Sequence, residues 1–328
     1  GLTYAVSMGM GVSAAHARVG AVMESIESWH AENLRLPVAA RGPAAGLGIG
    51  YDVRGLNLAP RSPLSASVVL DWARGHTLLT GRETLAPIDG IRLDGTAPRD
   101  WASVLFRPTS EGLATGNTET EAALHGLLEL VERAALAGYR AARRAGAQGA
   151  PPRFVDPETC RDPVTRRIYE AVRDAGCTVR VRDVGGPTGL PCFLATVWSA
   201  EMPIRCVGHA CHVRSELALG RALGEAVLTR LAAISGARDD IDGVVYREMA
   251  EPERPAAPAD VRDFDRGDLA DDGDLDSVLR HCAALVAGVT GVEPLVVRLT
   301  HDDVGIPAVK VVAPGLRNAA QTTTTGAR

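Results

Sequence analysis

Five glutamates in otherwise apolar helical segments are the residues of this sequence best suited to chemistry. Glu24 and Glu27 are three residues apart, so they share one helix face, and Glu129 and Glu132 repeat that spacing. Glu225 is the fifth, flanked by leucine, alanine and valine. Carboxylates that converge in a partly dry site repel one another unless cations intervene. Oxygen ligands on rigid helices suit Mg²⁺, which usually carries phosphates on its open faces.

The residues alone therefore predict a Mg²⁺–nucleotide site built from helix carboxylates, with Arg133 and Arg221 as partners of the phosphates. The alternative is a set of exposed helix faces with ion pairs at i,i+3 and i,i+4, for example Glu225 with Arg221. Three separate helices, each with acids in Ala- and Leu-rich surroundings, favour the metal site.

Three further patterns suggest other chemistry. Glu27 and His30 form an ExxH, half of a di-iron signature, but the helix of Glu129 has no second ExxH. The run 206–212 holds two cysteines and two histidines, but its C-x4-C spacing differs from the CxxC of ordinary zinc sites. Lys310 is the sole lysine, so a Walker-A loop is absent. We expect the Lys310 ammonium to reach water from the edge of an apolar strand.

Elements that position these residues follow from periodicity and capping signals. Ser13, Asn117 or Thr118, and Ser215 are expected to cap helices. The predicted helices are 14–36, 120–145, 163–175, 216–236 and 275–289, and the predicted strands are 1–8, 47–55, 66–72, 87–93, 178–184, 192–199, 294–299 and 307–313. A glycine-containing turn is expected at 112–116. The alternation of helices and strands indicates a mixed α/β or α+β fold.

Composition narrows the function classes. The net charge is −5 and the hydrophobic content is 46% in 328 residues, so one large globular domain or two ordinary ones are expected, without nucleic-acid binding. No apolar run approaches the length of a membrane span. The six cysteines are scattered, which favours a reducing cytoplasm. The sequence begins at Gly1 within a predicted strand and without Met, so N-terminal strands of the domain are expected to be missing.

Four segments, in order along the chain, resemble the motifs of the YcaO-domain family. They are GMGVSAAHARVGAVMESIESWHAE at 9–32, GLATGNTETEAALHGLLELVERAA at 112–135, RALGEAVLTRLAAISGARDD at 221–240 and LTHDDVGIPAVKVVAPGL at 299–316. The WHAE that follows Ser28 is similar to the branch whose members work with a TfuA partner. The resemblance covers nearly the whole chain and implies a YcaO-like domain over 1–317, with long helices carrying carboxylates over a nucleotide cleft.

The resemblance implies ATP-dependent activation of a peptide backbone amide through phosphorylation of its oxygen. It assigns Mg²⁺ to Glu24, Glu27, Glu129, Glu132 and Glu225, and the nucleotide to Asn117, Arg133 and Arg221. An external sulfur donor would give a thioamide, and a neighbouring Cys, Ser or Thr side chain would give an azoline. We expect thioamidation, because of WHAE and because the sequence ends without the proline-rich tail of many azoline-forming members. A cytoplasmic homodimer is the family-level expectation.

Several positions depart from the family pattern. The departures are Met10 for the lysine of GKG, Gly20 for a serine, Ser28 for an arginine, Gly224 for a threonine, Leu228 for a glutamine and Arg317 for the glutamate of PGLE. They leave open an alternative of another class, a catalytically weakened homologue that serves as a peptide-binding scaffold. The Pro-, Asp- and Arg-rich stretch 251–274 is expected to be a solvated loop, and 318–328 a disordered tail.

Overall fold

The computed structural model describes residues 7–93, 105–145, 153–236, 258, 260–264 and 273–316. The chain divides into two compact units: unit 1 comprises residues 1–5, 23–145 and 270–328, and unit 2 comprises residues 6–22 and 146–269. Residues 1–6 of the predicted first strand, most of the predicted loop 251–274 and the whole predicted tail 318–328 lie outside the described residues. Within 251–274 the described part contains a short strand, β9 (Val261–Asp263).

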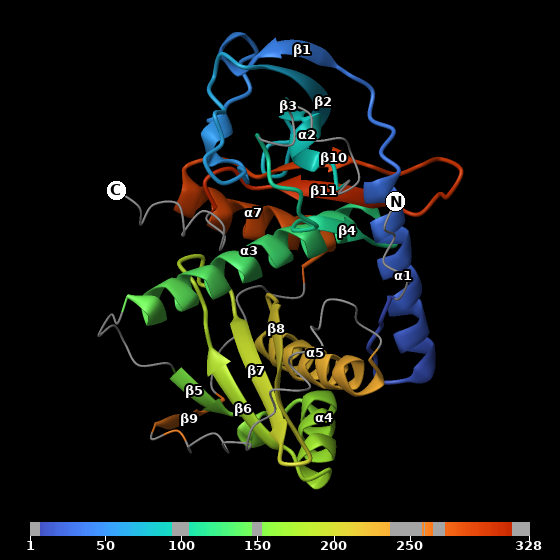
Figure 1. Cartoon of the computed structure of the whole chain (residues 1–328), viewed down its shortest axis with the longest axis vertical. Helices are drawn as coiled ribbons and strands as arrows, with labels where there is room; N and C mark the ends of the chain where they lie inside the picture. The colour runs from blue at the N-terminus through green and yellow to red at the C-terminus, as the bar shows by residue number, and fades with distance from the viewer. Residues whose placement is uncertain are drawn as a thin grey trace. The chain divides into compact units, whose positions relative to one another are not determined.

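Unit 1 is built on a six-stranded antiparallel sheet with the order β1-β2-β10-β11-β4, in which β3 also pairs with β2 (Figure 1). Its strands are β1 (Ala40–Pro43), β2 (Val69–Thr77), β3 (Glu83–Pro87), β4 (Leu113–Thr115), β10 (Leu295–Arg298) and β11 (Ala308–Val312). The sheet joins segments far apart in sequence, because β10 and β11 come from the C-terminal third of the chain and pair with β2 and β4, respectively.

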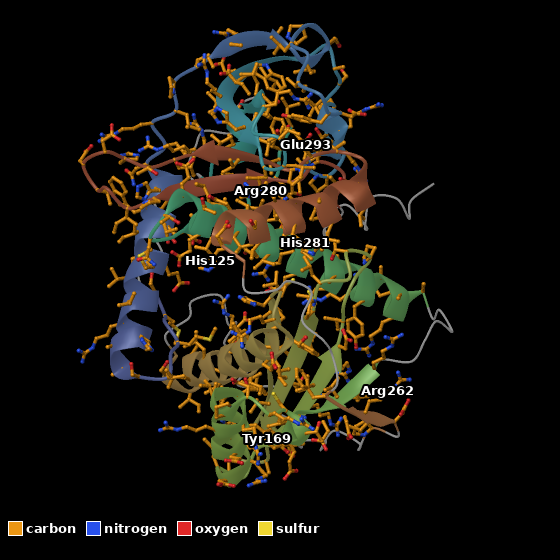
Figure 2. All side chains as sticks on the ribbon, turned by 180° about the vertical axis from the view of Figure 1, so that it is seen from behind. His125, Tyr169, Arg262, Arg280, His281 and Glu293 are labelled. Atoms are coloured by element: carbon orange, nitrogen blue, oxygen red, sulfur yellow. The ribbon has the colours of Figure 1, made fainter. Side chains whose placement is uncertain are left out.

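Helices cover this sheet. They are the C-terminal half of α1 (Ala14–Glu32), the short α2 (Ile88–Ile91), α3 (Glu119–Arg144) and α7 (Leu275–Thr290). The long helix α3 packs on β4, β11 and α7. Figure 2 marks His125 on α3 and His281 on α7, the two helices in contact. The core includes Trp72, which is fully buried and donates its indole N–H to the carbonyl of Gly42 at 2.8 Å.

A histidine joins α1 to the loop between β10 and β11. His30 is fully buried, and its Nδ1 lies 2.7 Å from the carbonyl oxygen of Ile26. Its Nε2 accepts the backbone N–H of His301 at 3.3 Å, which makes Nδ1 the protonated nitrogen of the neutral ring. Burial lowers the pKa of His30, and the charge of His301 lowers it further, while the hydrogen bond to Ile26 opposes them.

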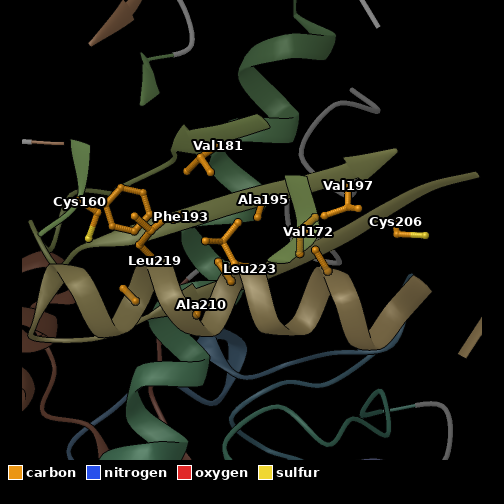
Figure 3. Packing of buried hydrophobic residues seen from close by; sticks show 13 residues of the cluster. Cys160, Val172, Val181, Phe193, Ala195, Val197, Cys206, Ala210, Leu219 and Leu223 are labelled. Atoms are coloured by element: carbon orange, nitrogen blue, oxygen red, sulfur yellow. The ribbon is translucent and has the colours of Figure 1, made fainter. Parts of the chain in front are cut away.

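Unit 2 is built on a five-stranded sheet with the order β8-β7-β6-β5-β9, antiparallel except for the β5–β9 pair. The strands that precede β9 are β5 (Arg153–Asp156), β6 (Thr178–Asp183), β7 (Cys192–Ser199) and β8 (Met202–Cys211). Helix α4 (Pro163–Asp174) packs on β6, and α5 (Ser215–Ser235) packs on β7, β8 and α4. Phe193, Leu219 and Leu223 lie in the core between sheet and α5 (Figure 3).

The predicted mixed fold is confirmed, and two predicted strands are wrong. Residues 47–55 hold no strand; the 3₁₀ turn Val53–Gly55 ends them, and Gly48 and Gly50 have positive φ angles of 60° and 79°, which interrupt extended backbone. Residues 87–93 also form no strand, because β3 ends at Pro87 and α2 follows. Residues 7 and 8 of the predicted first strand belong to no strand.

Helix ends were predicted more closely. Thr118 caps α3 by accepting the backbone N–H of Glu121 at 3.1 Å. Ser215 is the first helical residue of α5 rather than its cap, which is Arg214. The first helix ends at Glu32 instead of residue 36. Strand β8 was not among the predicted strands. Among the helices of the described ranges, none combines the length and the apolar character that a bilayer crossing requires.

Candidate active site

Two of the predicted glutamates, Glu27 and Glu129, interact through their charges within unit 1. Glu27 comes from the C-terminal half of α1 and Glu129 from the middle of α3. Burial, followed by the charges of Glu129 and Glu24, raises the pKa of Glu27 from 4.5 to about 8. A hydrogen bond from the backbone of Thr115 and the charge of Lys310 oppose this rise. The charge of Glu129 thus disfavours the charged form of Glu27.

Gly112, the last residue of the loop before β4, contacts Glu129. The backbone N–H of Gly112 donates to Glu129 Oε2 at 3.0 Å. Gly112 has a φ angle of 79°, and a side chain there would overlap with the carbonyl oxygen of Val311. Burial raises the pKa of Glu129, while Arg133 and this N–H oppose the rise. Most of the turn predicted at 112–116 is strand β4 in the structure. Gly112, just before this strand, donates the backbone N–H that the carboxylate of Glu129 accepts.

Arg133 lies between two of the predicted metal ligands. Its guanidinium is 3.4 Å from Glu129 Oε1 and 3.8 Å from Glu132 Oε1. The side chain of Glu132 is 13% exposed and that of Glu129 26% exposed, so these ion pairs are only partly screened by water. The predicted i,i+4 ion-pair alternative is thus present on α3, but on a half-buried face rather than on a solvated one.

The lysine was misjudged from the sequence. Lys310 is 4% exposed, not at a strand edge in water, and its Nζ donates to the carbonyl of Thr109 at 2.6 Å. Burial lowers its pKa to about 8, whereas the charges of Glu129, Glu111 and Glu27 raise it. A buried cation beside Glu27 and Glu129 makes Lys310 part of this cluster. The sequence signal that could have predicted the burial of Lys310 is that this residue, the sole lysine among 35 basic residues, lies inside an apolar strand.

Asn117 and Glu24 are more exposed members of the set in unit 1. The side-chain amide and the backbone N–H of Asn117 both donate to Glu121 Oε2, each at 2.9 Å. This double hydrogen bond holds the chain between β4 and α3, and it engages the amide that was predicted to contact a nucleotide. Glu24 lies one turn before Glu27 on α1 and is exposed.

Glu225 is held in unit 2 by a contact that spacing did not predict. Its Oε2 accepts the backbone N–H of His209 on β8 at 2.6 Å and lies 3.3 Å from the Nδ1 of that histidine. A side chain on Gly208 would overlap with backbone atoms of Ala222 and Ala226, so this glycine lets α5 lie directly on β8. That close approach brings Glu225 onto His209.

The predicted set thus divides between the units. Glu24, Glu27, Glu129, Glu132, Asn117 and Arg133 belong to unit 1, and Glu225 and Arg221 belong to unit 2. The convergence of all five glutamates stays a prediction. In the part of the chain that the structure describes, His, Cys, Asp and Glu side chains form no cluster of three or more that could hold a metal ion by itself. In the cysteine–histidine run 206–212, Cys206 and Cys211 are buried free thiols of β8.

The residues of unit 1 nevertheless fit Mg²⁺ chemistry. Glu27 and Glu129 are carboxylates whose burial and mutual repulsion disfavour two negative charges, which a divalent cation would relieve. Mg²⁺ typically takes only one or two carboxylates in such sites, together with water and substrate phosphates. Unit 1 therefore does not need three protein ligands of its own to bind Mg²⁺.

Solved structures share the fold of this chain. A heterocyclase in complex with substrate and cofactor matches 94% of the chain with a TM-score of 0.73 and 19% identity, and the chain spans 44% of that protein. The YcaO protein of Methanopyrus kandleri bound with AMPPCP and Mg²⁺ matches 94% of the chain and 78% of its own length, with a TM-score of 0.68 and 21% identity. The mixed α+β architecture with two sheets is thus that of the YcaO structures.

The chain belongs to the YcaO family. The family model described as YcaO cyclodehydratase, ATP- and Mg²⁺-binding, matches residues 8–317. An uncharacterized protein of Mycobacterium tuberculosis is 35% identical over 96% of this chain and 72% of its own length. A Rhizobium leguminosarum protein named for the region 3′ of tfuA is 30% identical over 96% of this chain and 77% of its own length. The resemblance to the TfuA-associated branch is supported by this second relative, and ATP and Mg²⁺ are the cofactors of the family.

Proposed function

We propose that this chain activates the backbone amide of a peptide by ATP-dependent phosphorylation of the amide oxygen, and that an external sulfur donor turns the activated amide into a thioamide. The observation that carries the proposal is the half-buried pair Glu27 and Glu129, with carboxyl pKa values raised by burial, in a chain of an ATP- and Mg²⁺-binding family. Bound Mg²⁺–ATP would supply the phosphoryl group that makes the amide oxygen a leaving group.

The chain's own residues have distinct roles in this proposal. Glu24, Glu27, Glu129, Glu132 and Glu225 hold Mg²⁺, and Asn117, Arg133 and Arg221 contact the nucleotide. Arg133 is already oriented by Glu129 and Glu132, which keeps its guanidinium at the cluster before a phosphate arrives. Lys310 compensates the charge of Glu129 and is tied to Thr109, so it acts as a fixed cation beneath the carboxylates.

The choice of thioamide over azoline rests on the TfuA-associated relative and on WHAE at 29–32. A TfuA-like partner protein, a homodimer and a cytoplasmic location belong to the same proposal. A cyclodehydratase of the same family is the nearest alternative, because the family model and a fold neighbour carry cyclodehydratase and heterocyclase names. A weakened, peptide-binding homologue is the third, motivated by the departures at Met10, Gly20, Ser28 and Leu228.

The decisive experiment is calorimetric titration of the purified protein with AMPPCP in the presence and absence of Mg²⁺. Glu129→Gln and Glu225→Gln each remove one carboxylate charge, and Glu170→Gln removes one from the exposed ion pair with Arg166 on α4 as a matched control. We expect saturable, Mg²⁺-dependent binding that is lost in both test variants and kept in the control. Absence of binding in the wild type would leave the scaffold alternative.

A further inference from the structure

A large hollow lies wholly within unit 2, and the proposed chemistry leaves its shape unexplained. It has a volume of about 750 Å³, is open to solvent, and is lined by residues 9–12, the first turns of α1, and parts of α4 and α5. Pockets of about 300–1,000 Å³ commonly bind a drug-sized ligand, and the volume of this cavity lies within that range. Five of its lining residues are large apolar side chains that are exposed to solvent: Met10, Val12, Val164, Val227 and Leu231.

Gly9 and Gly11 shape the wall that the segment before α1 contributes to this cavity. A side chain on Gly9 would overlap with the backbone of Ala17, and one on Gly11 would overlap with His16. The chain before α1 can therefore fold tightly onto that helix, with Met10 between the two glycines lining the cavity. A Cβ atom on Gly224 of α5 would lie 3.0 Å from Met10 Sδ. Met10 thus takes up the space that a larger residue at 224 would need.

The charges around the cavity suit an uncharged occupant. Among the described lining residues, Arg221 and Asp162 are the only ones with a formal charge at pH 7, and their charges are opposite. Asp162 is the cap of α4, where its carboxylate accepts the backbone N–H of Thr165 at 2.7 Å. The positive end of that helix is therefore already matched by a carboxylate, which disfavours a phosphate at this end of the cavity.

Three departures from the family pattern meet in this one place. Met10, Gly224 and Leu228 all line the cavity, and they replace lysine, threonine and glutamine of the motifs that the sequence resembles. Each change removes a polar group, and Met10 and Gly224 fit each other sterically. A random loss of function would not be expected to concentrate matched polar-to-apolar changes on a single wall.

We propose that this cavity binds a short, uncharged apolar segment of the peptide substrate, and that Met10, Gly224 and Leu228 set that specificity. The inference rests on the proposed function only for identifying the occupant as substrate. Arg221 lines the same cavity, and Glu225 is the next residue after Gly224 on α5. An apolar segment seated here would therefore anchor the peptide beside residues proposed to serve the nucleotide and the metal.

The test uses a photoreactive tripeptide, N-acetyl-Leu-photoleucine-Leu-amide, with the labelled site mapped by mass spectrometry. N-acetyl-trileucine amide, N-acetyl-triserine amide and Mg²⁺–AMPPCP are the competitors. Leu231→Gln changes an apolar side chain that is 54% exposed and lines the cavity. Ile234→Gln is the matched control, because Ile234 is 60% exposed on the same helix and does not line it. Gly224→Leu, which fills the cavity, is a second test variant, and circular dichroism verifies that all three variants fold.

We expect labelling of the cavity wall that trileucine amide suppresses and triserine amide does not. Affinity should fall about tenfold in Leu231→Gln, as for a lost apolar contact in a binding pocket, and stay unchanged in Ile234→Gln. Labelling outside the cavity, an equal loss in both glutamine variants, or suppression by Mg²⁺–AMPPCP would overturn the proposal. So would conversion of a dimer to a monomer by Leu231→Gln in sedimentation, since a second copy would then cover the cavity. Failure of the proposed function has a separate readout, namely AMPPCP binding that does not depend on Glu129.

Discussion

Neutralising Glu27 should make the metal-free protein more stable at alkaline pH. The carboxyl pKa of Glu27 is raised from 4.5 to about 8 by burial and by the charges of Glu129 and Glu24. Between these two values the folded state binds a proton that the unfolded state has lost, so stability falls as pH rises. At about 1.4 kcal/mol for each pH unit, the full loss is about 5 kcal/mol by pH 8.

Glu27→Gln keeps the shape of the protonated carboxyl and cannot ionise. We therefore expect the free energy of unfolding of the variant to lack this fall, so that the variant exceeds the wild type by about 3–5 kcal/mol at pH 8 and matches it near pH 4.5. The assay is urea unfolding in EDTA at pH 5, 6.5 and 8, followed by tryptophan fluorescence. Glu24→Gln, an exposed change one turn earlier on α1, is the control and should keep most of the wild-type slope, because the charge of Glu24 raises the pKa of Glu27 less than burial and the charge of Glu129 do.

The reasoning would be refuted by parallel pH profiles for the wild type and Glu27→Gln. That result would mean that the carboxyl of Glu27 is solvated in the folded protein, and the proposed cation site in unit 1 would lose its physical basis. An equal effect from Glu24→Gln would instead point to the net charge of α1 rather than to burial.

Three further outcomes are expected. Because the pKa of His30 is lowered, its contribution to stability is fully present above pH 6.5 and is lost as pH falls toward the folded-state pKa; His30→Gln should flatten the urea midpoint between pH 5 and 7.5. Gly208→Ala forces a methyl group into the backbone of α5 and should cost about 3 kcal/mol or more by thermal unfolding, whereas Gly138→Ala on α3, with open space around it, should stabilise by about 0.5–1 kcal/mol; equal effects would contradict the close packing of β8 and α5. Burial raises the pKa of the Cys282 thiol to about 12, so a thiol reagent at pH 8 should modify the half-buried Cys177 first, and early labelling of Cys282 in folded protein would show that α7 opens locally.

Local signals in the sequence were sufficient for the long helices. The cap at Thr118 and the apolar periodicity after it predicted α3 nearly to the residue. Helix α5 ends at Ser235, one residue before the predicted end at Gly236, which is its cap with a φ angle of 63°. The glutamates could be selected for the same reason, because acids at helical spacing in apolar surroundings are visible without tertiary contacts. Family motifs then supplied roles that spacing alone could not.

Strands and burial depended on contacts between distant segments. The run 47–55 looks extended in isolation, but none of the strands in the described ranges pairs with it, and the 3₁₀ turn Val53–Gly55 and two positive-φ glycines shape it instead. Strand β8 forms because β7 pairs with it and α5 covers it, which its cysteine–histidine composition does not reveal. Unlike β7 and β8, which follow each other in the chain, β10 pairs with β2 and β11 pairs with β4, segments far away in sequence, so these two pairings cannot be read locally.

The sequence by itself determined the helices, the mixed α+β class, the family and the glutamates that the proposed chemistry uses. Tertiary structure decided which of these groups are buried and what they touch. Lys310 lies among carboxylates only because β11 pairs with β4 and α3 packs over both, and Glu225 meets His209 only because Gly208 admits α5 onto β8. The physical reason is that a side chain's charge state depends on its desolvation and on its neighbours, and both are set by packing between distant segments.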